Sequence, residues 1–210
     1  MTQTVIGISG LIGSGKDTAA QVLVDELGFE RMSFAMVLKD VTAVLFDWDR
    51  DMLEGTTPES RAEREIADPW WTEKMGREWS PRIALQVLGT DVMRNNLHEN
   101  IWVNTVENRL RKAGDVVFTD VRFPNEIEFI NKVGKHWVVD RGKYPAWYDQ
   151  AVIYNRSDSE QREKLELAGR GPEDWGAHAS EYSWVGCFPD AYIANTKTIE
   201  DLHFHVRNLV

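Results

Sequence analysis

The chain has 210 residues, with 24 Lys and Arg against 34 Asp and Glu, and a formal net charge of −10. This acidic balance argues against direct binding to nucleic acid or to membrane surfaces, because both rest on clustered basic side chains. Cys187 is the single cysteine, so an intrachain disulfide is excluded and a reducing cytosol fits. We find no signal peptide and no run of about 20 apolar residues, and we therefore expect a cytoplasmic protein.

Length and composition predict one domain over residues 1–210, with room for an inserted subdomain. In the first third of the chain, apolar spacing predicts alternating strands and helices. We expect a strand over residues 5–8, a helix over 16–27 closed by Gly28, a strand over 31–34 and a helix over 37–45.

Residues 47–79 are rich in charges and show no clean period, which we interpret as a mobile cap on the acceptor side of a cleft. Trp70, Trp71 and Trp79 in this segment either stack on a base or pack internally, and the sequence does not separate the two. Ser80 and Pro81 predict a helix start, with Ser80 as the N-cap, and apolar spacing continues to residue 92. A further helix is expected over 101–112.

In the second half of the chain, apolar spacing again predicts alternating strands and helices. We expect strands over residues 115–119, 136–139 and 191–194, and helices over 126–133 and 199–209. Residues 140–180 are polar, and we predict flexible loops there with one short helix over 160–167. This segment is our candidate lid, bringing one arginine among Arg156, Arg162 and Arg170 toward a reacting phosphate.

Strands separated by helices predict an α/β fold of three layers, in which a central parallel sheet has helices on both faces. Ligands bind beyond the carboxyl ends of such strands. The run from Gly10 to Lys16 (GLIGSGK) lies there and fits G-x-x-x-x-G-K, the phosphate-binding loop. Its glycines let main-chain N–H groups converge on phosphate oxygens, and Lys16 would neutralise the β and γ phosphates. A plain glycine turn before a helix is the alternative.

Two carboxylates are candidate magnesium ligands. Asp17 follows the loop lysine, where Ser or Thr is usual, and Asp120 ends the apolar run Val116–Phe118. Their structural alternatives are a first-turn acid and a strand-end cap. Phosphoryl transfer between two anions needs further cations, for which Lys39, Arg64, Arg82 and Arg122 are candidates, although each alone also fits a solvated surface charge.

Several of these segments together resemble a known family. The matching segments are SGKDT (14–18), SPR (80–82), LGTD (88–91), Trp102, DVRFPNE (120–126) and HASE (178–181). In this order they resemble the deoxynucleoside monophosphate kinases encoded by tailed phages. The resemblance implies a P-loop nucleoside monophosphate kinase-like fold, the use of ATP and Mg²⁺, and conversion of deoxynucleoside monophosphates to diphosphates.

The resemblance also implies roles for individual residues. The ATP phosphates would bind Gly13, Ser14, Gly15, Lys16, Asp17 and Thr18. The acceptor nucleotide would lie against Arg82, Gly89, Thr90 and Trp102, and the cleft would be lined by Asp120, Arg122 and Glu126. Catalysis would depend on Lys16, Arg82 and Arg122.

We therefore expect ATP- and Mg²⁺-dependent phosphorylation of deoxynucleoside monophosphates, which supplies DNA precursors. The alternatives are a P-loop kinase of another small phosphorylated metabolite and a noncatalytic nucleotide-binding switch. A guanine-specific switch usually has an Asn-Lys-x-Asp-like motif, which this sequence lacks. A homodimer is compatible with the sequence.

Overall fold

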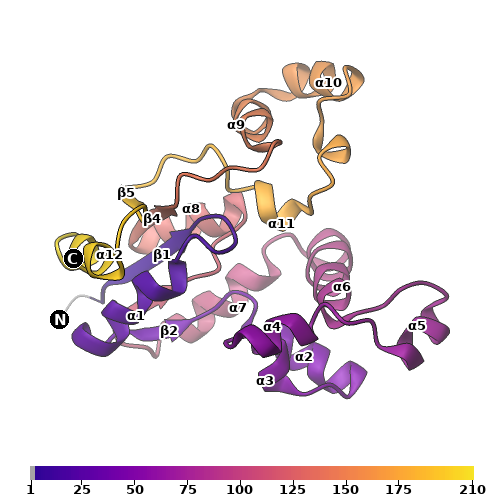
Figure 1. The fold of residues 1–210 in the computed structure, drawn as a ribbon, viewed down its shortest axis with the longest axis horizontal. Helices are drawn as coiled ribbons and strands as arrows, with labels where there is room; N and C mark the ends of the chain where they lie inside the picture. Colours follow the sequence, from indigo (N-terminus) through magenta and orange to yellow (C-terminus); the bar gives the residue numbers. More distant parts are fainter. Residues whose placement is uncertain (1–2) are drawn as a thin grey trace. The chain divides into compact units, whose positions relative to one another are not determined.

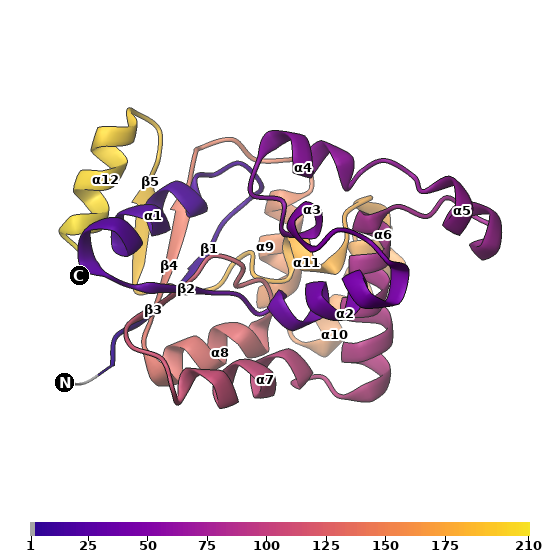
Figure 2. The same cartoon turned by 90° about the horizontal axis from the view of Figure 1, so that it is seen from below.

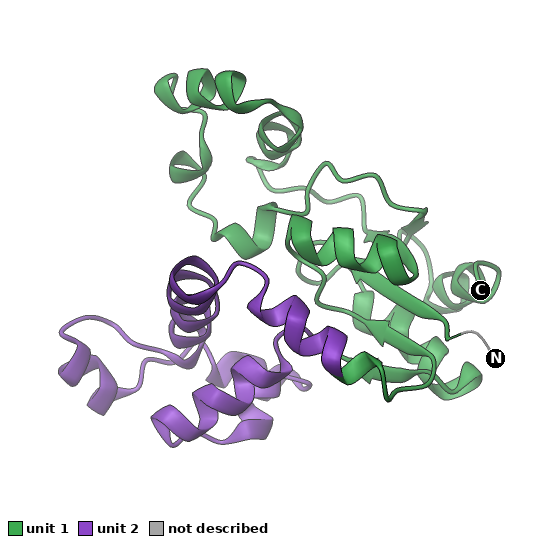
Figure 3. Cartoon of the chain, turned by 180° about the vertical axis from the view of Figure 1, so that it is seen from behind, with its two compact units in different colours: residues 1–33, 109–210 green, residues 34–108 purple. Residues whose placement is uncertain are grey.

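The computed structural model describes residues 3–210. The chain divides into two compact units (Figure 3). Unit 1 comprises residues 1–33 and 109–210, and unit 2 comprises residues 34–108. The expectation of one domain over residues 1–210 stays a prediction.

Unit 1 is built on a five-stranded parallel sheet (Figure 1). Its strands are β1 (Val5–Ser9), β2 (Glu30–Met32), β3 (Val116–Phe118), β4 (Lys135–Asp140) and β5 (Ala191–Ala194). The spatial order is β2-β3-β1-β4-β5, and every neighbouring pair is parallel. The chain first forms the two strands on one side of β1, which are β2 and β3. It then forms the two strands on the other side, which are β4 and β5. This reversal places a ligand crevice at the carboxyl ends of β1, β3 and β4.

Helices cover both faces of the sheet, which confirms the predicted fold class. Figure 2 shows α1 (Lys16–Leu27) and α12 (Ile199–Arg207) on one face and α8 (Pro124–Val133) on the other. α1 packs against α12, while α8 packs against β1 and β4. The expected Gly28 cap is confirmed, since Gly28 ends α1 in the left-handed conformation.

The core of unit 1 lies between the sheet and the α1–α12 layer. β1 is buried along its whole length, as a central parallel strand requires. Ile6 and Ile8 of β1 pack with Leu23 of α1, Trp137 of β4 and Leu202 of α12. This packing fixes the ends of the central strands, from which the site loops emerge.

The segment between β4 and β5 contains more regular structure than the sequence indicates. It contains α9 (Tyr148–Arg156), α10 (Ser159–Leu167), the 3₁₀ turn η2 (Pro172–Asp174) and α11 (Ala179–Tyr182). The expected helix over 160–167 is confirmed as α10. The expectation that loops make up the rest of this segment is wrong, because it contains α9, η2 and α11, and the rings of Trp147, Trp175 and Tyr182 pack together beside α9.

Unit 2 is helical. Its elements are α2 (Met36–Phe46), α3 (Arg50–Glu54), α4 (Pro58–Glu63), α5 (Pro69–Met75), α6 (Pro81–Gln86), η1 (Val87–Leu97) and α7 (Ile101–Leu110), the last ending at the border with unit 1. Ser80 caps α6 as predicted, and its hydroxyl accepts a hydrogen bond from the Ile83 N–H at 3.3 Å. We expected one helix from Ser80 to residue 92. The structure has the α-helix α6 followed directly by η1, which is a π-helix of 11 residues.

The tryptophans of the 47–79 segment are mostly structural. Trp48 stacks on Phe46 with ring centroids 4.6 Å apart, and Trp71 meets the same ring edge-on at 4.8 Å. Trp79 is buried in this cluster, whereas Trp70 remains exposed. Internal packing therefore accounts for Trp71 and Trp79.

Candidate nucleotide-binding site

The GLIGSGK run forms a turn between β1 and α1. Three of its glycines, Gly10, Gly13 and Gly15, have positive φ angles of 152°, 74° and 100°. The Ser14 N–H donates to the Leu11 carbonyl at 3.1 Å, which closes the turn. α1 then begins at Lys16 and is 12 residues long, so its N-terminus faces this turn. The context that the phosphate-binding motif requires is present.

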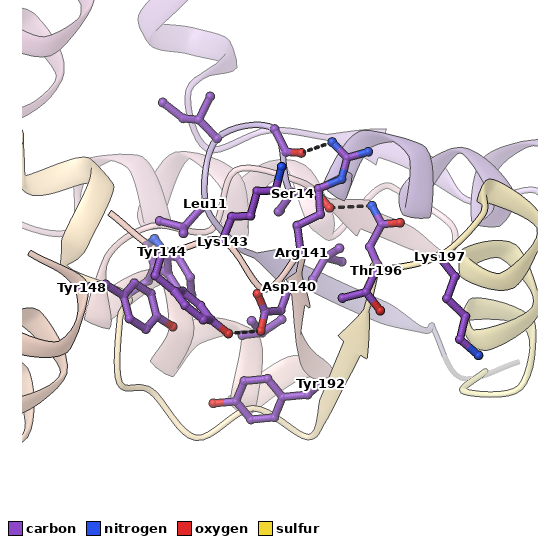
Figure 4. A pocket seen from close by; sticks show the side chains of 16 residues that line it. Leu11, Ser14, Asp140, Arg141, Lys143, Tyr144, Tyr148, Tyr192, Thr196 and Lys197 are labelled. Atoms are coloured by element: carbon purple, nitrogen blue, oxygen red, sulfur yellow. Dashed lines mark hydrogen bonds between the residues drawn. The ribbon is translucent and has the colours of Figure 1, made fainter. Parts of the chain in front are cut away.

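Side chains hold four carbonyl oxygens of this loop. The Lys16 ammonium donates to the carbonyls of Gly10 and Leu11 at 2.8 and 2.9 Å. Figure 4 shows the other two contacts, in which Arg141 donates to the Gly13 carbonyl at 2.9 Å and Asn195 to the Ser14 carbonyl at 2.8 Å. Oxygens fixed in this way are kept from an entering anion, which would meet main-chain N–H groups and the helix N-terminus.

A buried hydroxyl in the loop also suits a phosphate. Ser14 is only 3% exposed, and its Oγ has no hydrogen-bond partner within residues 3–210. A buried hydroxyl without a partner is costly, so a phosphate oxygen would satisfy it. The loop residues therefore fit the polyphosphate of a nucleotide.

The charge on Lys16 depends on its neighbours. Burial first, and then the positive charge of Arg122, lowers the pKa of Lys16 from 10.5 to about 8. The carboxylates of Asp17 and Asp120 oppose this lowering of the pKa. The three other side chains named as catalytic or metal-binding in unit 1 therefore all act electrostatically on Lys16.

Asp17 and Asp120 occupy different settings around Lys16. Asp17 lies in the first turn of α1, with its side chain 61% exposed, and pairs with Arg31 at 3.3 Å. Asp120 follows β3, and its carboxylate accepts a hydrogen bond from the Ser33 hydroxyl at 2.6 Å. Magnesium at phosphate sites commonly binds one or two carboxylates together with phosphate oxygens and waters, so Asp17 and Asp120 are side chains of the type that this ion takes as ligands.

Glu126 positions the loop that carries Arg122. Its carboxylate, in a side chain only 3% exposed, accepts hydrogen bonds from the N–H groups of Arg122 and Phe123 at 2.8 and 3.1 Å. From the other side, the Ser9 hydroxyl donates to the Val121 carbonyl at 2.8 Å. Glu126 thus caps the start of α8 and holds the main chain at Arg122. We expected Glu126 to line the cleft, but its carboxylate is buried and supports the loop that carries Arg122.

Two pockets of unit 1 flank the phosphate-binding loop. The larger, of 640 Å³, lies between the loop, the ends of β4 and β5 and the tyrosines Tyr144, Tyr148 and Tyr192 (Figure 4). The smaller, of 270 Å³, is lined by Lys16, Arg122, Lys143, Glu181 and the aromatic side chains of Trp147 and Trp184. An aromatic pocket next to a cationic one suits a nucleoside joined to a polyphosphate.

The acceptor-side candidates lie in unit 2. The Trp102 indole donates to the Gly89 carbonyl at 2.8 Å, which joins α7 to the π-helix. Lys39 forms an ion pair with Glu54 at 2.5 Å, and the Arg64 guanidinium donates to the Leu53 carbonyl at 3.2 Å. The Arg82 N–H donates to the Arg64 carbonyl at 2.9 Å, and Thr90 follows Gly89 in the π-helix. The structure therefore joins Gly89 to Trp102 directly and gives Lys39 and Arg64 structural partners.

The sequence interpretation missed Arg141, Lys143, Asn195 and the pocket tyrosines. The signal was available, since residues 141–143 follow β4 directly and Asn195 follows β5 directly. This is the same strand-end rule that selected Asp120.

The chain is similar in sequence to known kinases. The family model described as deoxynucleotide monophosphate kinase matches residues 54–144. A putative deoxynucleotide monophosphate kinase of Acanthamoeba polyphaga mimivirus is 35% identical over 151 residues, covering 65% of this chain and 74% of the relative. The chain belongs to the deoxynucleotide monophosphate kinase family.

A second relative of this kinase is the deoxynucleoside-5′-monophosphate kinase of Escherichia phage T5. It is 28% identical over 187 residues, covering 61% of this chain and 72% of the phage protein. The predicted resemblance to virus-encoded kinases is confirmed, and the chain is a phosphotransferase that phosphorylates nucleotides.

Solved structures overlap the kinase along most of its length at low identity. Shikimate kinase from Aquifex aeolicus has a TM-score of 0.45 and 14% identity, covering 98% of this chain and 95% of that one. Dephospho-CoA kinase from Campylobacter jejuni has a TM-score of 0.44 and 16% identity, covering 99% of this chain and 96% of that one.

None of the helices within residues 3–210 has the length and the apolar character that a membrane span requires.

Proposed function

We propose that this kinase transfers the γ-phosphoryl group of ATP to the 5′-phosphate of deoxynucleoside monophosphates, with Mg²⁺ as the metal. The observation that carries the proposal is the shared environment of Lys16. One ammonium in a phosphate-binding loop is influenced by Arg122, Asp17 and Asp120, beside an aromatic pocket large enough for a nucleoside. The family relationship supplies the acceptor class.

On the donor side, the base and ribose of ATP would occupy the 640 Å³ pocket against Tyr144, Tyr148 and Tyr192. The polyphosphate would follow the loop from Gly13 to Thr18. Lys16 would then exchange its bonds with the Gly10 and Leu11 carbonyls for phosphate oxygens. This exchange is favourable because the pairing of an ammonium with an anion is stronger than its pairing with a neutral carbonyl.

Asp17 and Asp120 would hold Mg²⁺ as a pair. When bound, the ion neutralises charge that develops on the β- and γ-phosphate oxygens. Two carboxylates suffice for a metal that takes most of its remaining ligands from substrate phosphate and water.

On the acceptor side, Arg82, Gly89, Thr90 and Trp102 are the proposed contacts with the nucleoside monophosphate, and Lys39 and Arg64 remain proposed secondary cations. An oxygen of the acceptor phosphate forms a bond to the γ-phosphorus while the bond from that phosphorus to the β-bridging oxygen breaks, and ADP leaves. The acceptor phosphate is already a nucleophile, so no general base is assigned. Lys16, Arg82 and Arg122 supply charge neutralisation and alignment.

The biological role proposed is the supply of DNA precursors in the host cytoplasm. An ADP-release assay with a panel of acceptors tests the activity. The panel contains the four common deoxynucleoside monophosphates, their ribose counterparts, phosphomevalonate and dephospho-coenzyme A. We expect ADP release that depends on at least one deoxynucleoside monophosphate and on Mg²⁺. Release with only the last two acceptors, or with none, would contradict the proposal.

A further inference from the structure

The chain makes a tight turn as it leaves β4. One carboxylate oxygen of Asp140 accepts a hydrogen bond from the Gly142 N–H at 2.8 Å, and the other accepts one from the Tyr144 hydroxyl. Gly142 has a φ of 69°, a conformation that glycine adopts without strain. Asp140 thus fixes the course of residues 141–144 from both ends.

This turn directs two cationic side chains at the phosphate-binding loop. Figure 4 shows Arg141 and Lys143 extending toward the loop, while Lys197 points away from it. Arg141 is committed to the Gly13 carbonyl at 2.9 Å, which ties the turn to the loop. Lys143 has no hydrogen-bond or ion-pair partner within residues 3–210.

Lys143 also stands where the two pockets meet. It lines both the aromatic pocket of 640 Å³ and the cationic pocket of 270 Å³ that holds Lys16 and Arg122. A nucleotide with its base in the first pocket and its terminal phosphate in the second has its phosphate chain at this junction. The Lys143 ammonium at this junction would therefore contact the phosphate chain of the nucleotide, and not its base.

Two of the three candidate arginines in the helical segment after this turn are committed elsewhere. Arg156 donates to the Gly186 carbonyl at 2.8 Å and lies over the Phe188 ring at 4.6 Å. Arg162 donates to the carbonyls of Tyr154 and Asn155 at 3.0 and 2.9 Å. Neither lines either pocket.

We propose that Lys143 is a further catalytic residue, whose ammonium contacts the γ-phosphoryl group of ATP during transfer. The inference rests on the proposed function. In the transition state, charge spreads over the equatorial oxygens of the transferring group, and a cation held at their edge stabilises it. The flexible lysine stem lets the ammonium follow the phosphorus as it moves, while Arg141 keeps the turn in place.

The test compares three variants. Lys143→Ala removes the cation and Lys143→Arg keeps it. Lys135→Ala is the matched control, because Lys135 is an exposed lysine at the start of β4, whereas Lys143 follows the end of β4. We expect Lys143→Ala to lower kcat about 100-fold, with Lys143→Arg recovering at least a tenth of the parent value and Lys135→Ala unchanged. Circular dichroism and thermal unfolding establish that all three variants fold.

Calorimetric titration with ATP and with ADP, in the presence of Mg²⁺, gives a readout that does not depend on turnover. A charge-assisted contact is worth about 1.5–3 kcal/mol, so Lys143→Ala should weaken ATP binding by about 10- to 100-fold and ADP binding by much less. Equal binding of ATP by parent and variant, or equal weakening for ATP and ADP, overturns the inference. If the parent releases no ADP with any deoxynucleotide, the proposed function fails, and the titrations still decide the contact.

Discussion

Arg31 holds Asp17 at two points: its guanidinium pairs with the carboxylate at 3.3 Å and donates to the main-chain carbonyl of the same residue at 3.0 Å. Arg31 belongs to β2 and Asp17 to the first turn of α1, so the pair joins the edge strand to the proposed metal site. A magnesium ion that binds Asp17 must compete with this guanidinium. Because the Asp17 side chain is 61% exposed and that of Arg31 is 35% exposed, solvent screens the ion pair and the competition is weak.

The first prediction concerns the metal requirement. Asp17→Asn removes a negative charge from the metal site and should raise the Mg²⁺ concentration that gives half-maximal activity, and Asp120→Asn should do the same. Arg31→Gln frees the carboxylate and should lower that concentration by up to about 5-fold. Magnesium titrations at saturating ATP measure both effects.

Asp25→Asn is the control for this prediction, since Asp25 lies on the same helix and pairs with Gln21 at 2.7 Å. It should leave the titration unchanged. If the curves of Asp17→Asn and Asp120→Asn overlay that of the parent, these carboxylates do not bind the metal.

The second prediction concerns pH. In the free protein the pKa of Lys16 is lowered from 10.5 to about 8, chiefly by burial and then by Arg122. ATP binds the protonated form, so its affinity should fall about tenfold per pH unit above pH 8. Binding near pH 8.5 should also take up protons. Calorimetry in two buffers of different ionisation enthalpy measures that uptake.

Two variants sharpen this test. Lys16→Arg keeps its charge throughout the range and should remove the alkaline fall in ATP affinity. Arg122→Ala removes a charge that lowers the Lys16 pKa, so the fall should begin at a higher pH, while kcat drops about 100-fold. An alkaline fall that is the same in the parent and in both variants would assign the titration to another group.

The third prediction compares two glycines in the left-handed conformation, Gly15 at the N-terminus of α1 and Gly28 at its C-terminus. Gly28→Ala meets no atom within 4 Å, so its cost is the backbone strain of about 1–2 kcal/mol, with no change in ATP affinity. Gly15→Ala adds a Cβ only 2.3 Å from the Asn195 amide nitrogen, which must then leave the Ser14 carbonyl. Urea unfolding should show a larger loss for Gly15→Ala, and calorimetry a loss of ATP affinity. Equal losses would mean that Asn195 does not hold the loop.

The fourth prediction concerns acid stability. His136 is fully buried, and its Nε2 lies 2.8 Å from the Ser9 hydroxyl, which itself donates to Val121. The Ser9 oxygen therefore accepts a hydrogen bond from the Nε2–H of His136. Burial lowers the pKa of His136 to about 4, and the charge of Asp190 opposes this lowering. Since an unfolded histidine takes up a proton near pH 6.5, about 3 kcal/mol of stability should be lost as the pH falls from 6.5 to 4.

His136→Gln removes this titration, and its unfolding free energy should depend less on pH across that window than that of the parent. His205→Gln, at an exposed position of α12, is the control and should follow the parent. Parallel pH profiles for the parent and His136→Gln would contradict the assignment.

Local patterns predicted much of the donor side. The apolar β1, the glycine turn, the amphipathic α1 and the strand-end Asp120 were all visible, because each depends on neighbouring residues in the sequence. The positioning role of Glu126 was not visible, since its bonds to the Arg122 and Phe123 N–H groups depend on how the chain turns back after β3. Arg141 and Asn195 could have been selected by the strand-end rule that selected Asp120, because they follow β4 and β5 directly. Their contacts with the loop carbonyls depend on how β4 and β5 lie beside β1.

The segment between β4 and β5 shows a second reason for error. Its high charge suggested loops, but ring packing among Trp147, Trp175 and Tyr182 supports helices instead. Within this helical segment, Arg156 and Arg162 donate hydrogen bonds to main-chain carbonyls. In unit 2, no pattern in the residues 87–97 distinguished a π-helix from an α-helix.

Transfer of label from ATP to the acceptor tests the central claim most directly. The kinase is incubated with Mg²⁺, a deoxynucleoside monophosphate and ATP labelled in its γ-phosphate, and the products are separated by chromatography. The parent should form labelled deoxynucleoside diphosphate and ADP in equal amounts, and Lys16→Ala, folded by circular dichroism, should form less than about a hundredth as much. Label released only as inorganic phosphate, or transfer by Lys16→Ala at the parent rate, would contradict the account.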